Sequence, residues 1–168
     1  MASAQLALFQ SVGLAGEENT LPLRTLEFKK DDPISRLPAR YSPIPASTNS
    51  YEIWIRLHLE GANPDTSDVT AIKFWFTSPS ARWFALFTGV DLKYKLVSSF
   101  AQPSTVAMAG ATSIKASPTT KVTWTTPHAS NYLNESNMWT DYLVLQLQYG
   151  ASDTWPIPVR LNWEYTVV

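Results

Sequence analysis

The stretch YEIWIRLHLE (residues 51–60) alternates between two kinds of side chain along its whole length. One set of alternate positions holds only aromatic and aliphatic residues: Tyr51, Ile53, Ile55, Leu57 and Leu59. The other set is mostly polar: Glu52, Trp54, Arg56, His58 and Glu60. A repeat of two residues is that of a β-strand with one face in a core and the other in water. The stretch therefore predicts a half-buried strand.

Similar alternation recurs along the rest of the chain. The clearest further stretches are VTAIKFWFTS (69–78), VDLKYKLVSSF (90–100), MWTDYLVLQLQYG (138–150) and PVRLNWEYTVV (158–168). Shorter candidates are ARWFALF (81–87), TVAMA (105–109), TSIKAS (112–117) and TKVTWTT (120–126). Because turn-forming residues separate most of these stretches, they predict about seven or eight short strands. We expect an all-β body over residues 51–168, of the β-sandwich or jelly-roll-like kind.

Residues 1–50 differ from this body and predict an extended N-terminal arm. They hold five of the 12 prolines, which favour extended and irregular backbone: Pro22, Pro33, Pro38, Pro43 and Pro45. Apolar residues still recur along the arm, and six of them are expected to anchor it on a protein surface, that of a neighbouring molecule being favoured: Leu6, Phe9, Leu23, Phe28, Leu37 and Tyr41. An arm that docks elsewhere predicts that removal of residues 1–40 leaves a folded body. The alternative is that the arm covers an edge strand of its own body.

Two shorter patterns lie within the arm. LPLRTLEF (residues 21–28) predicts a short strand. Residues 4–12 carry the only helix-like periodicity in the chain. No Lys or Arg precedes Arg24, so we do not expect a signal peptide there.

The composition argues against several classes of protein. The net charge is −1 and only 16% of the 168 residues are charged, so the basic surface typical of a nucleic-acid-binding protein is not expected. No apolar run approaches the roughly 20 residues of a membrane span. Cysteine is absent, which excludes disulfides, thiolate catalysis and sulfur-based zinc sites within this sequence.

A search for catalytic chemistry yields weak candidates, and we expect no enzyme, no catalytic residues, no cofactor and no metal site. His58 lies on the polar side of a predicted strand and His128 in a loop, far apart in the sequence. NPDTSD (residues 63–68) offers oxygen ligands, but turn chemistry explains the same residues and the spacing is not that of an EF-hand. A hydrolase with paired carboxylates on a jelly roll is the least favoured alternative.

Seven tryptophans are the most unusual feature of the composition. Trp54 and Trp75 each lie on the side of their strand opposite the aliphatic residues. If the aliphatic residues face the core, both rings face outward and mark a contact surface. Protein contact is favoured over sugar stacking, because no cluster of polar sugar-binding residues accompanies them.

The order of these features supports a comparison with a known group of proteins. The relevant residues are the proline-rich arm, YEIWIRLHLEG (51–61), VTAIKFWF (69–76), GVDLKYKL (89–96), DYLVLQLQYG (141–150) and IPVRLNWEYTVV (157–168). This order resembles that of small virion proteins that decorate the heads of tailed bacteriophages. The resemblance implies a β-sandwich body with an N-terminal arm and no catalytic residues.

The resemblance also implies a function and a location. The protein would be made in the host cytoplasm, bind the major capsid protein on the outer surface of the phage head and stabilise the head by bridging neighbouring subunits. It would associate with itself, as a homotrimer. The alternative is a carbohydrate- or receptor-binding β-sandwich module of a virion neck or tail, or of a secreted enzyme.

Overall fold

A computed structural model describes residues 5–14, 16–23, 26–31, 44–45, 47–60, 69–77, 90–114, 120–128, 131–134, 138–149 and 160–168. These residues form nine β-strands, and no α-helix occurs among them. The strands are β1 (Gln5–Val12), β2 (Asn19–Pro22), β3 (Ile53–Glu60), β4 (Val69–Thr77), β5 (Val90–Val97), β6 (Thr112–Ser113), β7 (Val122–Thr123), β8 (Tyr142–Tyr149) and β9 (Arg160–Val167).

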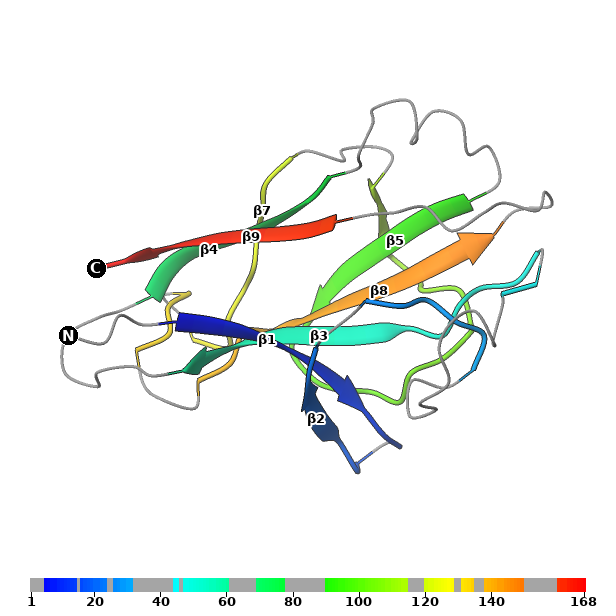
Figure 1. Cartoon of the computed structure of the whole chain (residues 1–168), viewed down its shortest axis with the longest axis horizontal. Helices are drawn as coiled ribbons and strands as arrows, with labels where there is room; N and C mark the ends of the chain where they lie inside the picture. The colour runs from blue at the N-terminus through cyan, green and yellow to red at the C-terminus, as the bar shows by residue number, and fades with distance from the viewer. Residues whose placement is uncertain are drawn as a thin grey trace.

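The strands form two antiparallel sheets. One has six strands in the order β2-β1-β3-β8-β5-β6, and the other has three in the order β7-β4-β9. In Figure 1 the three-stranded sheet lies above the strands β1, β3 and β8 of the larger sheet. The predicted all-β, sandwich-like fold is confirmed, because the two sheets pack face to face around one shared core.

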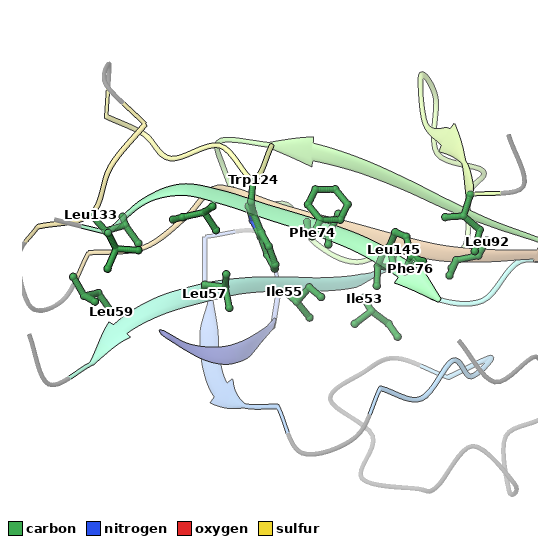
Figure 2. Close-up of a cluster of buried hydrophobic side chains, with 14 of the residues drawn as sticks. Ile53, Ile55, Leu57, Leu59, Phe74, Phe76, Leu92, Trp124, Leu133 and Leu145 are labelled. Atoms are coloured by element: carbon green, nitrogen blue, oxygen red, sulfur yellow. The ribbon is translucent and has the colours of Figure 1, made fainter. Parts of the chain in front are cut away.

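The core consists of the side chains that the alternation of each strand directs inward. Residues of β3 and β4 meet between the sheets with Trp124 beside them, as Figure 2 shows. Eight of its members from β3, β4 and the segment with Trp124 are 0% to 3% exposed: Ile53, Ile55, Leu57, Leu59, Ile72, Phe74, Phe76 and Trp124. Burial of this apolar surface is the main stabilising contribution to the fold.

The outer face of the six-stranded sheet is also covered over part of its area. A second apolar cluster there contains Trp54, Met108, Tyr142 and Val144, with Phe100 packed against it. Gln146 of β8 is 0% exposed and holds the covering segment by accepting from the Met108 N–H at 3.1 Å and donating to the Val106 carbonyl at 3.0 Å. The middle of β8 is therefore buried on both faces.

The first described residues of the chain belong to this larger sheet. β1 pairs antiparallel with β3 from Gln5 opposite Glu60 to Ser11 opposite Trp54, and β2 pairs with β1 on its other side. The helix-like periodicity of residues 4–12 was misleading, since β1 is a strand with apolar side chains on both faces. Strands β1 and β2 lie in the chain's own sheet, so the prediction that this part of the chain extends away from it is wrong for these two strands. The covering of the chain's own edge was the alternative that the sequence left open.

Other predicted strands differ from the structure in extent. The strand expected within residues 21–28 begins earlier, since β2 covers 19–22. Residues 105–109 form no strand, because they belong to the covering segment held by Gln146. The predicted strand at 81–87 lies outside the described residues.

Candidate functional site

The outer face of the three-stranded sheet carries one large aromatic side chain in polar surroundings. Trp75 of β4 is half-buried there and lies opposite Asn162 of β9. The neighbouring pairs across β4 and β9 are Lys73 with Glu164 and Thr77 with Arg160. We call this set of residues the Trp75 face.

A charged pair lies over the ring of Trp75. The Lys121 Nζ lies 4.8 Å from the ring centroid and 2.6 Å from the Glu164 Oε2. Both charged side chains are about half exposed, so the ion pair is screened by water and contributes little to stability. The ring of Trp75 is therefore covered on one side by a charged pair and remains half-buried. Such an aromatic ring with an arginine nearby is typical of protein contact sites.

A second constellation lies on the outer face of the larger sheet, where the β1–β2 hairpin meets β3 and β8. The Glu18 carboxylate is its centre and accepts from the Ser11 hydroxyl at 2.6 Å, the Arg56 Nη2 at 2.7 Å and the Tyr142 hydroxyl at 2.8 Å. The Arg56 guanidinium lies 4.1 Å from the ring centroid of Trp139 and 4.6 Å from that of Tyr142. We call this group the Glu18 cluster.

The electrostatics of the Glu18 cluster favour a structural role. Burial is the largest cause that raises the pKa of Tyr142 above its ordinary value of 10.0, and its hydrogen bond to Glu18 raises it further. Tyr142 therefore stays protonated and donates to Glu18 at neutral pH. The carboxylate neutralises Arg56 at the same time, so neither group is free to act as a base or to bind an outside anion. The cluster fastens the hairpin to the sheet.

Local irregularity places Trp139 beside Arg56. The register between β3 and the residues before β8 shifts by one residue between the pair Ile55–Leu143 and the bridge His58–Trp139. Thr140 satisfies the backbone at this point, because its hydroxyl accepts from the Leu57 N–H at 2.9 Å. Such a shift turns a side chain to the other face of a sheet.

The site residues predicted in the N-terminal segment mostly pack on the chain itself. Leu6, Leu23 and Phe28 are partly buried against the core. Phe9 is half-buried, with its ring 5.6 Å from His58 and 5.2 Å from Trp139. Two further predicted contact residues, Leu37 and Tyr41, lie outside the described residues.

The two tryptophans predicted to face outward have different positions. Trp54 is 3% exposed, with its ring 5.3 Å from that of Phe100 and 5.7 Å from that of Tyr142. It does point away from the main core, but the covering segment buries it, so the prediction of an outward contact residue is wrong for Trp54. Trp75 does lie on an outer face and is only half-buried.

The Glu18 cluster was not foreseen from the sequence. Arg56 and Tyr142 lie 38 and 124 positions from Glu18 along the chain, so no local spacing connects them. The one available signal was an arginine that shares the polar side of its strand with a tryptophan and a histidine.

A cavity of about 560 Å³ lies at the surface between residues 30–31, residues 47–51 and Thr105. Its lining is mainly hydrogen-bonding and charged: Lys30, Asp31, Ser47, Thr48, Asn49, Tyr51 and Thr105. The Asn49 side chain is held by its hydrogen bond to the Thr105 carbonyl at 3.1 Å. The lining offers both hydrogen-bond donors and acceptors but no concentrated charge.

Among the described residues, no three His, Cys, Asp or Glu side chains come together in a way that could hold a metal ion. The predicted oxygen ligands of residues 63–68 lie outside that part of the chain. The described residues contain no helix that is long and apolar enough to cross a membrane.

The chain was compared with protein-family models, with curated proteins and with solved structures, and none of them matches it.

Proposed function

We propose that this protein is a structural component of a virion, a decoration or cement protein that binds the outer surface of a tailed-phage head. It acts by surface contact with the major capsid protein and stabilises the shell by linking neighbouring subunits. The resemblance in the order of strand sequences supports this proposal, and so does the β-sandwich body. The homotrimer that the same resemblance implies stays a prediction.

The observation that carries the proposal is the Trp75 face. A half-buried tryptophan on an outer sheet face, with Arg160 on the neighbouring strand, supplies the two residue types, Trp and Arg, that are enriched in protein contacts. Contacts of this kind suit attachment to a shell. When one assembly makes many weak contacts with the same lattice, each contact raises the effective concentration for the next, and the overall attachment becomes strong.

The route of attachment differs from the one that the sequence suggested. Strands β1 and β2 are hydrogen-bonded within the chain's own sheet, so their backbone is not extended away from the body. The contact with the capsid is therefore assigned to the body, and first to the Trp75 face.

The glycan-binding alternative loses its main support. It depended on two exposed rings, Trp54 and Trp75, as a stacking platform for sugars. Trp54 is 3% exposed, so one ring of the pair is lost.

Co-sedimentation tests the proposal directly. The purified chain is mixed with expanded empty heads of the phage that encodes it, and the bound fraction is measured after pelleting. We expect binding by the wild type and a bound fraction lowered about tenfold or more by Trp75→Ala, as for loss of a buried aromatic anchor. Val106→Ala is the matched control, since Val106 is 73% exposed and lies over the other sheet.

The results of this experiment distinguish capsid decoration from glycan binding and test the role of the Trp75 face. If the wild type does not pellet with heads, or if labelling locates the chain on the neck or tail, the decoration proposal is wrong. If Trp75→Ala binds heads as well as the wild type, the Trp75 face is not the contact. Binding to a glycan array that is lost in Trp75→Ala would favour the carbohydrate-binding module instead.

A further inference from the structure

The four outer edges of the two sheets are very different in length. The larger sheet ends in β2, with four residues including Pro22, and in β6, with two residues. The smaller sheet ends in β7, with two residues, and in β9, with eight. Proteins limit unwanted pairing by keeping edge strands short or interrupted by proline. β9 alone among these edges has neither protection.

The free side of β9 is open over the described part of the chain. β9 pairs with β4 on one side, and no described strand pairs with its other side. The inward-facing side chains are also less buried on β9 than on β4. Phe74 and Phe76 of β4 are 0% and 3% exposed, whereas their inward-facing partners on β9, Trp163 and Leu161, are only partly buried. The strand order β7-β4-β9 places β9 at the edge of the smaller sheet.

The outward side chains of β9 carry one positive and one negative charge, Arg160 and Glu164. Four residues apart on one strand, they are separated by about 13 Å and do not meet within one chain. A second copy of β9 lying antiparallel beside the first can bring them together.

The geometry of antiparallel pairing limits the possible registers. A two-fold axis perpendicular to the sheet keeps outward residues opposite outward residues, so the centre of the pairing falls on a residue. With the axis at Asn162, Arg160 lies opposite Glu164 of the second copy, and the pair occurs twice by symmetry. A shift of the axis by one residue in either direction removes both charge pairs. On the inner side, the same register places Leu161 opposite Trp163 of the second copy.

We propose that the free edge of β9 binds a second copy of itself in this register, with Asn162 opposite Asn162 on the two-fold axis. The two three-stranded sheets then join into one continuous six-stranded sheet. Lys121 binds Oε2 of Glu164 at 2.6 Å, and a carboxylate has a second oxygen with which to accept from the arginine. The pairing also covers the half-exposed flank of Trp163 and Leu161. The two-fold contact closes at two copies, unlike the homotrimer that the sequence resemblance implies.

Disulfide trapping tests the register. The chain contains no cysteine, so Asn162→Cys introduces a single thiol. Residues directly opposite each other in an antiparallel pair have Cα atoms about 4.5–5.5 Å apart, within the range that a disulfide spans. Under mild oxidation we expect Asn162→Cys to form covalent dimers. Thr166→Cys is the matched control, because it is more exposed on the same strand yet lies far from its symmetry mate in this register.

Charge reversal tests the pairing of Arg160 with Glu164 of the second copy. We expect the wild type to sediment at twice the 18.8 kDa of one chain over a wide range of concentrations. Glu164→Arg places like charges opposite each other twice and should raise the dimer Kd about tenfold. The double variant Arg160→Glu with Glu164→Arg restores the pairs and should restore the Kd. Lys121→Ala removes the ion pair with Glu164 and the contact with the Trp75 ring, both within one chain, and should leave the Kd unchanged.

Three outcomes would contradict the proposal. A wild type that is monomeric at all concentrations, or trimeric, shows that β9 does not pair in this way. Cross-linking at residue 166 and not at 162 shows a different register. A dimer that is indifferent to both charge variants shows a different interface. These measurements need only the purified chain, so they stand or fall separately from capsid binding.

Discussion

Among single residues, Glu18 makes the most consequential contacts. Its carboxylate joins three parts of the sequence, the β1–β2 hairpin, β3 and β8, through Ser11, Arg56 and Tyr142. Hydrogen bonds to a charged group contribute about 1.5–3 kcal/mol each before screening by water. The Glu18 side chain is 25% exposed, so the smaller end of that range applies. The hairpin is held at its tip as well as along its strands.

Tyr142 gives this cluster a pH dependence at alkaline pH. Burial and the bond to Glu18 raise its folded-state pKa above the ordinary 10.0. Below pH 10 the tyrosine is protonated in both the folded and the unfolded state, and its contribution is fully present. As pH rises above 10 the unfolded chain releases the proton first, so this contribution is lost on the way to the raised pKa. Tyr142→Phe cannot ionise and lacks this loss.

We therefore expect the stability difference between the wild type and Tyr142→Phe to shrink above pH 10. Near neutral pH the variant should be less stable by about 1.5 kcal/mol, the smaller end of the range for a hydrogen bond to a charged group. Urea unfolding at a series of pH values measures the stability difference at neutral pH and its decrease above pH 10. The two proteins differ only at residue 142, so the comparison isolates the contribution of Tyr142. A difference that stays constant from neutral pH to well above pH 10 would contradict this account.

The two tryptophans show what could be predicted about single residues. The alternation correctly placed Trp54 and Trp75 on the face opposite the core of their strands. It could not show that the segment containing Phe100 and Met108 covers one of these faces. That covering depends on Gln146, whose partners are about forty or more positions away in the sequence. Which face a strand residue occupies is local information, whereas the exposure of that face is not.

Among the elements, β1 changes the expectation for truncation. The sequence predicted that removal of residues 1–40 leaves a folded body. In the structure β1 pairs with seven residues of β3, so its removal exposes the edge of β3 and the apolar contacts of Leu6 and Leu8. We now expect a chain without residues 1–22 to lose most of its stability and to aggregate through the exposed edge.

Circular dichroism and urea unfolding of the truncated chain test this expectation. Removal of residues 1–4 alone is the control, because β1 begins at Gln5 and its pairing is kept. A chain lacking residues 1–22 that unfolds at the same urea concentration as the full chain would show that β1 is dispensable.

The strands of the body were the most predictable elements. The alternation located β3, β4 and β9 to within two residues, because each has one face in the core and keeps a clear repeat of two. β1 escaped prediction since Phe9 contacts Trp139 and His58 on one face while Leu8 packs on the core from the other. The register shift beside Thr140 could not be predicted from the sequence either, because it depends on pairing between distant segments.

For the whole molecule, the two sheets are joined by Trp124. Its backbone N–H donates to the Ile72 carbonyl of β4 at 2.8 Å, within the smaller sheet. Its ring N–H donates to the Asp141 carbonyl at 2.9 Å, next to β8 of the larger sheet. The ring is 0% exposed and lies 5.5 Å from that of Phe74. One side chain therefore contributes to both layers and to the core between them.

This position predicts that Trp124→Ala destabilises the whole sandwich in one transition. Removal of a buried tryptophan costs about 3–5 kcal/mol, which lowers the Tm of a chain of this size by about 10 °C or more. Because the residue belongs to both sheets, calorimetry should show a single cooperative peak at the lower temperature. Trp75→Ala is the matched control, since its half-buried ring lies outside the core and its loss should lower the Tm much less. Two separate peaks in Trp124→Ala would show instead that the sheets unfold independently, and the sandwich would then be two cooperative units.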